Sequence, residues 1–149
     1  MTDNPVFAPG LFAGRHVLVT GGATGIGFGI ARELGGLGAR VTLASRDPAK
    51  LDDAVARLRT EGIAAARQVI NIRDAAAIEA LFATLAATGD LPDALINNAG
   101  GQFSAPALET SANGFRAILD LNLQGGFQMC RAYAAALVAQ GRRGHIVNI

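Results

Sequence analysis

Short apolar segments recur along this chain, and a longer segment with helical hydrophobic spacing separates each one from the next. Their sequences are HVLVT, RVTLAS, AARQVIN, ALINNAG and HIVNI, at residues 16–20, 40–45, 65–71, 94–100 and 145–149. Strands that are apolar throughout are typical of parallel sheets with helices on both faces, because a parallel neighbour requires a crossover connection. The alternation therefore predicts an α/β fold built on a doubly wound, Rossmann-like parallel sheet.

Capping residues mark where the intervening helices are expected to begin and end. Asp47 and Asp74 each precede a helical segment, where a side-chain oxygen can accept hydrogen bonds from unpaired N–H groups. Gly89 follows the second of these helices and is predicted to end it. A long helical region over about 111–140 is predicted to be interrupted around Asn122 and Gly125-Gly126. The apolar stripes expected to face the core are Leu51, Val55 and Leu58 in one helix and Ile78, Leu81, Phe82 and Leu85 in the next.

Charge and cysteine content argue against several classes of protein. Thirteen basic and twelve acidic residues give a net charge of +1, so no general field draws nucleic acid or an anionic membrane to the chain. The apolar runs are far shorter than the roughly 20 residues that span a bilayer. The single cysteine, Cys130, cannot form an internal disulfide and fits a reducing compartment. We expect a soluble, cytoplasmic protein that binds neither nucleic acid nor membrane.

The most informative motif is TGGATGIG at residues 20–27, between the first predicted strand and the first predicted helix. Glycine adopts positive φ without penalty and lets a phosphate approach the backbone, and a helix N-terminus offers unpaired N–H groups. The spacing of Gly21, Gly25 and Gly27 differs from the G-x-G-x-x-G dinucleotide fingerprint. The position after the first strand nevertheless favours dinucleotide binding over the alternative, a purely structural turn.

The end of the second predicted strand bears on which dinucleotide is bound. An acidic residue at this place takes the ribose hydroxyls of NAD, whereas an arginine suits the 2′-phosphate of NADP. This chain has Ser45 followed by Arg46, and a guanidinium can hold a phosphate through two parallel hydrogen bonds. We therefore expect NADP(H) rather than NAD(H). The alternative is that Arg46 is an ordinary surface arginine near the start of a helix.

Four stretches together resemble the short-chain dehydrogenase/reductase family: TGGATGIG (20–27), NNAG (97–100), DLNLQGGF (120–127) and GHIVNI (144–149). The resemblance runs from about residue 14 to the end of the chain. It implies an NADP(H)-dependent oxidoreductase that transfers a hydride to or from a carbonyl or enoyl substrate. Within the family, the chain is most similar to enoyl-CoA and 2,4-dienoyl-CoA reductases. This resemblance implies a small-molecule substrate such as an acyl-CoA thioester and a homo-oligomeric parent protein.

Site residues follow from the same resemblance. Asn122 is similar to the asparagine whose backbone carbonyl holds a water in the family's proton relay; the alternative is a polar helix breaker without other function. Asn71 and Ile72 stand where the family usually has an aspartate that accepts from the adenine amino group, and an asparagine oxygen can accept this bond without charge. The other residues that the resemblance assigns to cofactor binding are Gly21, Thr24, Gly25, Ile26, Gly27, Ser45, Arg46, Asn98, Ala99 and Gly100.

The residues that carry the family's chemistry are missing from this sequence. The family uses a serine and a Tyr-x-x-x-Lys pair that follow the fifth strand. Here the only tyrosine is Tyr133 and the only lysine is Lys50, so no such pair exists. The resemblance therefore implies a chain truncated after the fifth strand, with an irregular lead-in at 1–13 and an incomplete dinucleotide-binding domain at 14–149. We expect no catalysis by these 149 residues alone.

Two other functions remain open from the sequence. The chain could be a non-catalytic module that binds a dinucleotide and turns over no carbonyl or enoyl thioester. It could also be an interaction protein that pairs through the exposed edge of its last strand, since an unpaired strand edge is a template for association.

Overall fold

The computed structural model describes residues 6–149, and residues 1–5 of the expected lead-in lie outside the described residues. Residues 9–14 form consecutive turns. Within them the Phe12 N–H donates to the Leu37 carbonyl at 2.9 Å, and the Phe12 ring packs against the core. The segment before the first strand is thus attached to the domain.

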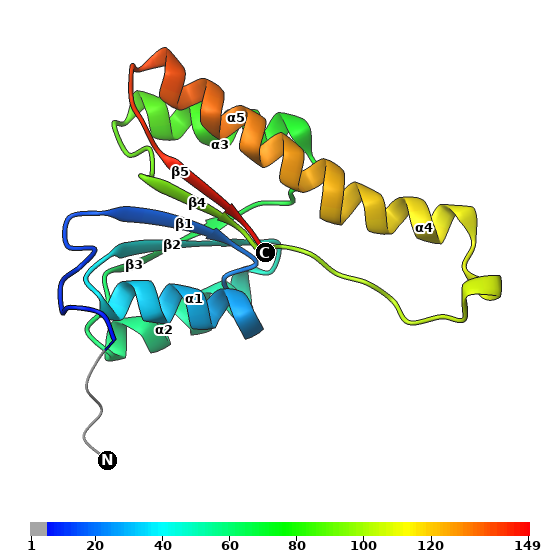
Figure 1. Ribbon diagram of the computed structural model, residues 1–149, viewed down its shortest axis with the longest axis horizontal. Coiled ribbons are helices and arrows are strands. Elements are labelled where there is room, and N and C mark those ends of the chain that lie inside the picture. The colour runs from blue at the N-terminus through cyan, green and yellow to red at the C-terminus, as the bar shows by residue number, and fades with distance from the viewer. Residues whose placement is uncertain (1–5) are drawn as a thin grey trace.

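Five parallel strands form one sheet, which confirms the predicted doubly wound α/β fold (Figure 1). The strand order is β3-β2-β1-β4-β5, so the direction of winding reverses between β1 and β4. Ligands of such sheets bind outside the carboxyl ends of the strands at this reversal. The strands are β1 (His16–Thr20), β2 (Arg40–Ser45), β3 (Ala65–Val69), β4 (Ala94–Asn97) and β5 (His145–Asn148).

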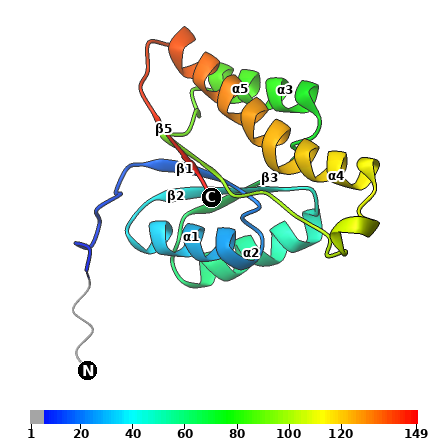
Figure 2. The same cartoon turned by 45° about the vertical axis from the view of Figure 1, so that its right-hand side comes forward.

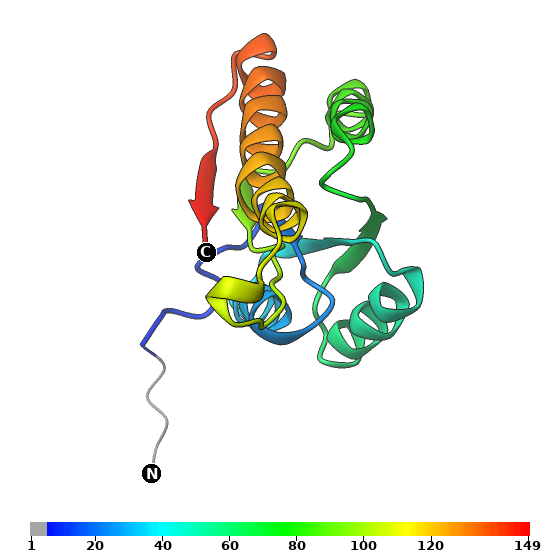
Figure 3. The same cartoon turned by 90° about the vertical axis from the view of Figure 1, so that its right-hand side faces the viewer.

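Helices cover both faces of the sheet. Figure 3 shows α1 and α2 on one face and α3 and α5 on the other. A long helical rod that starts with α4 and ends with α5 extends beyond the sheet (Figure 2). The helices are α1 (Gly25–Gly36), α2 (Pro48–Thr60), α3 (Ala75–Ala87), η1 (Ala107–Glu109, a 3₁₀ turn), α4 (Ala112–Leu119), η2 (Asp120–Gly125, a π-helical segment) and α5 (Gly126–Ala139).

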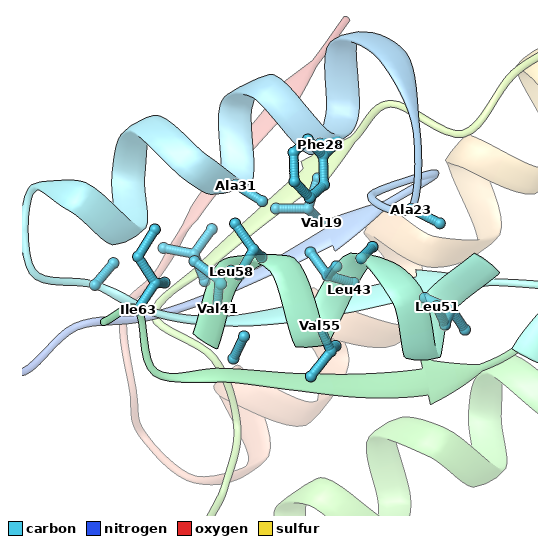
Figure 4. Packing of buried hydrophobic residues seen from close by; sticks show 14 of the residues in the cluster. Val19, Ala23, Phe28, Ala31, Val41, Leu43, Leu51, Val55, Leu58 and Ile63 are labelled. Atoms are coloured by element: carbon cyan, nitrogen blue, oxygen red, sulfur yellow. The ribbon is translucent and has the colours of Figure 1, made fainter. Parts of the chain in front are cut away.

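Each face of the sheet has its own hydrophobic core. Leu51, Val55 and Leu58 of α2 pack with α1 and with β1 and β2 on one face, as their spacing predicts (Figure 4). On the other face, Ile78, Leu81 and Phe82 of α3 pack against Met129, Tyr133 and Leu137 of α5. Leu85, predicted for the same stripe, is partly buried against this second cluster.

The predicted caps are confirmed. Asp47 accepts a hydrogen bond from the Lys50 N–H at 3.1 Å, and Asp74 accepts one from the Ala77 N–H at 3.0 Å. Gly89 follows α3 with a φ of 71°, the left-handed conformation that glycine adopts without a Cβ penalty. Each aspartate thus satisfies an N–H group that the first helical turn leaves unpaired.

The structure shortens one predicted element and specifies two others. β3 ends at Val69, because Asn71 begins a turn in which its carbonyl accepts from Asp74 N. The α-helix over 112–139 is interrupted around Asn122 as predicted, and the interruption is the π-helical segment η2, through which the chain stays helical. β5 is the edge of the sheet in the described residues, as predicted, and all four of its residues are exposed. None of the helices in residues 6–149 combines the length and apolarity needed to cross a membrane.

His16 at the start of β1 is a buried titratable group far from the carboxyl ends of the strands. Its side chain is 7% exposed, its Nε2 lies 2.8 Å from Thr42 Oγ1, and its buried Nδ1 has no hydrogen-bond partner within residues 6–149. Burial, and then the positive charge of Arg40, lower the pKa of the imidazole below its ordinary 6.5, although Asp90 and Asp93 act in the opposite sense.

Stability should therefore fall as the solution is acidified through neutrality. The unfolded chain binds the His16 proton near pH 6.5, whereas the folded chain resists it, so the loss begins near pH 6.5 and continues down to the folded pKa. Urea unfolding at pH 8, 6.5 and 5.5 should show this loss for wild type and a smaller one for His16→Gln. Asp90 stays ionised throughout, because a hydrogen bond from Arg40 lowers its pKa. Equal pH dependence of the two proteins would contradict the prediction.

Candidate functional site

A cavity of about 350 Å³ opens at the carboxyl ends of β1, β2, β3 and β4, where the winding of the sheet reverses. Its walls come from the glycine loop before α1, the ends of β2 and β3, the loop after β4, and η2. This is the position at which open α/β sheets bind their ligands. The lining residues are Gly21, Thr24, Gly25, Ile26, Ala44, Ser45, Arg46, Ile70, Ile72, Asn98, Ala99, Gly100 and Leu121.

The glycine loop exposes the N-terminus of α1 to this cavity. Gly21 and Gly25 have φ values of 65° and 55°, which only glycine adopts without strain. The Gly21 N–H donates to the Ala44 carbonyl of β2 at 2.7 Å, which fixes the loop to the sheet. Thr24 is the N-cap of α1, but its side chain makes no capping hydrogen bond. The first-turn N–H groups are therefore available to an anion.

Thr20 joins the glycine loop to the loop after β4. Its buried Oγ1 accepts hydrogen bonds from the N–H groups of Asn98 at 3.0 Å and Ala99 at 2.9 Å. In the other direction, Asn98 Nδ2 donates to the carbonyl of Thr20 at 3.0 Å and lies 3.4 Å from that of Gly21. Two walls of the cavity are thus held together by side-chain-to-backbone bonds and keep their shape without a ligand.

Asn122 fixes the same loop from the other side. Its Oδ1 accepts from the Gly101 N–H at 3.0 Å, and its Nδ2 donates to the carbonyls of Gly101 at 2.7 Å and Ile118 at 2.9 Å. A Cβ on Gly100 would lie 2.6 Å from Asn122 Oδ1, so a larger residue there would displace the Asn122 carboxamide. The structure therefore gives Asn122 a positioning contact with the loop, and its side chain lies outside the first cavity.

Ser45 and Arg46 form the wall at the end of β2. The Ser45 hydroxyl is buried and has no hydrogen-bond partner within residues 6–149, a costly state for a hydroxyl unless a ligand completes it. The Arg46 guanidinium makes no hydrogen bond or ion pair with any described residue. The adjacent Asp47 carboxylate is engaged by Lys50 and by its capping bond. Both side chains predicted to hold a 2′-phosphate are thus available at the cavity.

The structure brings together all predicted cofactor-binding residues except Gly27 and Asn71. Gly27 lies behind the glycine loop, where α1 packs on Gly21. Asn71 is exposed, and its Oδ1 accepts from the Arg73 N–H at 3.2 Å instead of facing the cavity. Sequence reasoning missed Ala44, Ile70 and Leu121. The first two are the last apolar residues before predicted site positions, which is a usable signal, whereas Leu121 reaches the cavity only through tertiary packing.

A second cavity of about 440 Å³ lies on the far side of the loop after β4. Tyr133 does not reach either cavity: it is fully buried, its hydroxyl donates to the Pro92 carbonyl at 3.0 Å, and burial raises its pKa to about 12. Tyr133 is therefore a core residue of α5. Within residues 6–149, no three His, Cys, Asp or Glu side chains gather to hold a metal ion.

The second cavity is lined by Asn97, Asn98, Ala99, Gly100, Asn122, Leu123, Gly126, Phe127, Cys130, Asn148 and Ile149.

Comparison with known proteins agrees with this geometry. A family model described as short chain dehydrogenase matches residues 15–149. The peroxisomal 2,4-dienoyl-CoA reductase of Arabidopsis thaliana is 40% identical over 155 aligned positions, which cover 99% of this chain and 51% of that protein. The citronellol catabolism dehydrogenase of Pseudomonas aeruginosa superposes with a TM-score of 0.88 at 36% identity, over 96% of this chain and 58% of the other.

A structure with bound cofactor also matches. The gluconate 5-dehydrogenase of Burkholderia cenocepacia, solved in complex with NADP and tartrate, superposes with a TM-score of 0.82 at 34% identity, over 91% of this chain and 53% of that one. The chain thus spans about half the length of each of these three proteins.

Proposed function

Because the chain belongs to the short-chain dehydrogenase family, we propose that it is the cofactor-binding part of an NADP(H)-dependent oxidoreductase. In the parent enzyme a hydride passes to or from a carbonyl or enoyl substrate. The observation that carries this proposal is the cavity at the sheet reversal, where an uncapped helix N-terminus and an unpartnered serine hydroxyl meet. We assign residues 14–149 to this dinucleotide-binding domain.

The described residues fit a dinucleotide. The unpaired N–H groups at the start of α1 suit the pyrophosphate, and the positive φ of Gly25 turns the backbone toward it. Ile72 and Leu121 supply apolar walls on which the adenine can pack. When bound, the nicotinamide ring supplies or accepts the hydride. The protein's share is to bind the cofactor, orient it and exclude water around it.

The wall formed by Ser45 and Arg46 favours NADP(H) over NAD(H). A 2′-phosphate would accept from the unpartnered Ser45 hydroxyl and from the Arg46 guanidinium, which has no competing carboxylate in the described residues. Bonds to a charged group are the stronger class of hydrogen bond. The NADP bound to the gluconate 5-dehydrogenase relative is consistent with this preference.

Catalysis requires groups that this sequence does not contain. Its one tyrosine is buried with a raised pKa and cannot act as an acid at the cofactor. We assign to Asn122 the role of holding a water of the proton relay through its backbone carbonyl. Its side chain fixes the loop between the two cavities, and the residue lines the second one. We expect the 149 residues to bind the cofactor without turning over a substrate.

The substrate, partner and compartment rest on the relatives and on composition. The 2,4-dienoyl-CoA reductase relative supports an acyl-CoA thioester as the small-molecule substrate of the parent enzyme. That the parent enzyme is a homo-oligomer rests on the family to which the chain belongs. A single cysteine supports a reducing compartment such as the cytoplasm.

The decisive experiment compares NADPH and NADH binding by fluorescence titration. Wild type should bind NADPH more tightly, and Arg46→Ala should weaken NADPH about tenfold to a hundredfold by removing a charged hydrogen-bond donor, with NADH unchanged. Arg143→Ala is the matched control, because it removes an exposed arginine just before β5, at the opposite end of the strands. Tighter binding of NADH, or equal losses for both cofactors, would refute NADP(H) preference; no saturable binding would refute the function.

A further inference from the structure

Two carbonyls at the end of α4 are held by side chains. Arg73, from the loop after β3, donates through Nη2 to the Ala117 carbonyl at 3.0 Å. Asn122 donates through Nδ2 to the Ile118 carbonyl at 2.9 Å. At this point the helix changes from the i→i+4 ladder of α4 to the i→i+5 ladder of η2, which moves carbonyls out of their α-helical alignment. Both side chains therefore act where the helical ladder is weakest.

A second contact joins the loop after β3 to η2. A Cβ on Gly125 would lie 2.9 Å from the Ile72 carbonyl oxygen and 3.0 Å from the Ile72 Cδ1, so the two backbones approach as closely as glycine permits. Ile72 and Leu121, one from each side of this contact, both line the dinucleotide cavity. The relative position of the two walls thus depends on the Ile72–Gly125 contact and on the Arg73 hydrogen bond.

We propose that Arg73 is a positioning residue for the dinucleotide site, which it serves without lining it. The inference rests on the proposed function. The main chain of Arg73 is fixed by the hydrogen bond from its N–H to Asn71 Oδ1. Its guanidinium binds the carbonyl of Ala117, which lies 44 residues further along the chain. Loss of this bond leaves the Ile72 wall free to move away from Leu121. Ligand binding must then supply the ordering that the arginine provides in advance.

The test measures NADPH affinity and the thermal midpoint of Arg73→Ala and Arg73→Lys. We expect Arg73→Ala to weaken NADPH and adenosine 2′,5′-bisphosphate equally, by about three- to tenfold, while the thermal midpoint stays near the wild-type value. Arg73→Lys should recover most of the affinity, because an ammonium group can also donate to a carbonyl. Arg131→Ala is the matched control, since it removes an exposed pair with Glu79 of comparable reach between α5 and α3.

Each other outcome overturns the inference. Undiminished binding by Arg73→Ala, or an equal loss in Arg131→Ala, would show that Arg73 does not position the walls. A lower thermal midpoint with unchanged affinity per folded molecule would show a structural role only. Failure of lysine to restore binding would show that the hydrogen bond to the Ala117 carbonyl is not what positions the walls. If wild type binds no NADPH, the proposed function fails and this inference fails with it; if wild type binds and Arg73→Ala binds equally well, only this inference fails.

Discussion

Gly27→Ala is expected to reduce NADPH binding more than tenfold and to lower the free energy of unfolding by about 1–3 kcal/mol, the usual cost of overpacking. Gly27 lies in the first turn of α1, directly behind the glycine loop. A Cβ at this position would meet Asn98 Nδ2 and would lie 2.5 Å from the Gly21 carbonyl oxygen. The second of these atoms is backbone and cannot rotate away, so α1 must shift.

The shift damages the site because the same atoms hold the cavity walls together. Asn98 Nδ2 donates to the Thr20 carbonyl and lies close to that of Gly21, so displacing it separates the loop after β4 from the glycine loop. The N-terminus of α1 moves with the helix, and its N–H groups leave the position that suits a pyrophosphate. Binding should therefore fall more than the change in stability alone would cause.

Gly29→Ala is the matched control for this prediction. It lies in the same helix, is exposed, and has no atom within 4 Å of an added Cβ. Alanine is the better helix former by about 1 kcal/mol, so this variant should be as stable as wild type or more stable, with unchanged NADPH affinity. Urea unfolding and a fluorescence titration of both variants decide the matter. Wild-type binding and stability in Gly27→Ala would show that α1 yields to the methyl group without cost.

Local sequence signals predicted the parts of the fold that depend on local physics. Apolar runs gave the strands, and Asp47, Asp74 and Gly89 marked helix ends because capping depends on residues within one turn. The cavity walls could be predicted for a related reason. In a parallel sheet the carboxyl ends of all strands meet at one edge, so residues just after separate strands become neighbours.

The missed features depend on contacts between distant residues. Arg73 holds the end of α4 just before η2 through Ala117, 44 residues further along the chain, and Gly125 of η2 packs closely on Ile72. The residue pattern of the segment 111–140 does not reveal such contacts, so the sequence predicted the interruption of the helix but not its π-helical form. For Asn71 a local contact overrides the motif. Its place after the third strand predicted a side chain at the cofactor cavity, but its Oδ1 accepts a hydrogen bond from the Arg73 N–H instead. A motif fixes the position of a residue more reliably than the direction of its side chain.

Tyr133→Ala is expected to remove a large part of the free energy of unfolding. The side chain of Tyr133 is fully buried, its ring centroid lies 5.7 Å from that of Phe82, and its hydroxyl donates to the Pro92 carbonyl. It thus joins α5 to α3 and to the segment before β4. Truncating a buried aromatic side chain to alanine costs about 3–5 kcal/mol, which approaches the whole stability of about 5–15 kcal/mol that folded proteins possess.

Tyr133→Phe separates the contribution of the ring from that of the hydroxyl. Phenylalanine keeps the packing against Phe82 but leaves the Pro92 carbonyl without its partner, so the loss should be smaller, about 1–3 kcal/mol. Urea unfolding followed by circular dichroism should rank the stabilities as wild type, then Tyr133→Phe, then Tyr133→Ala. NADPH binding by the folded fraction of Tyr133→Phe should equal that of wild type, because Tyr133 does not line the dinucleotide cavity. If both variants lost the same stability, the hydrogen bond to Pro92 and not the ring would hold α5 on the sheet. If Tyr133→Phe lost NADPH affinity per folded molecule, the two faces of the sheet would be coupled more tightly than their separate cores indicate.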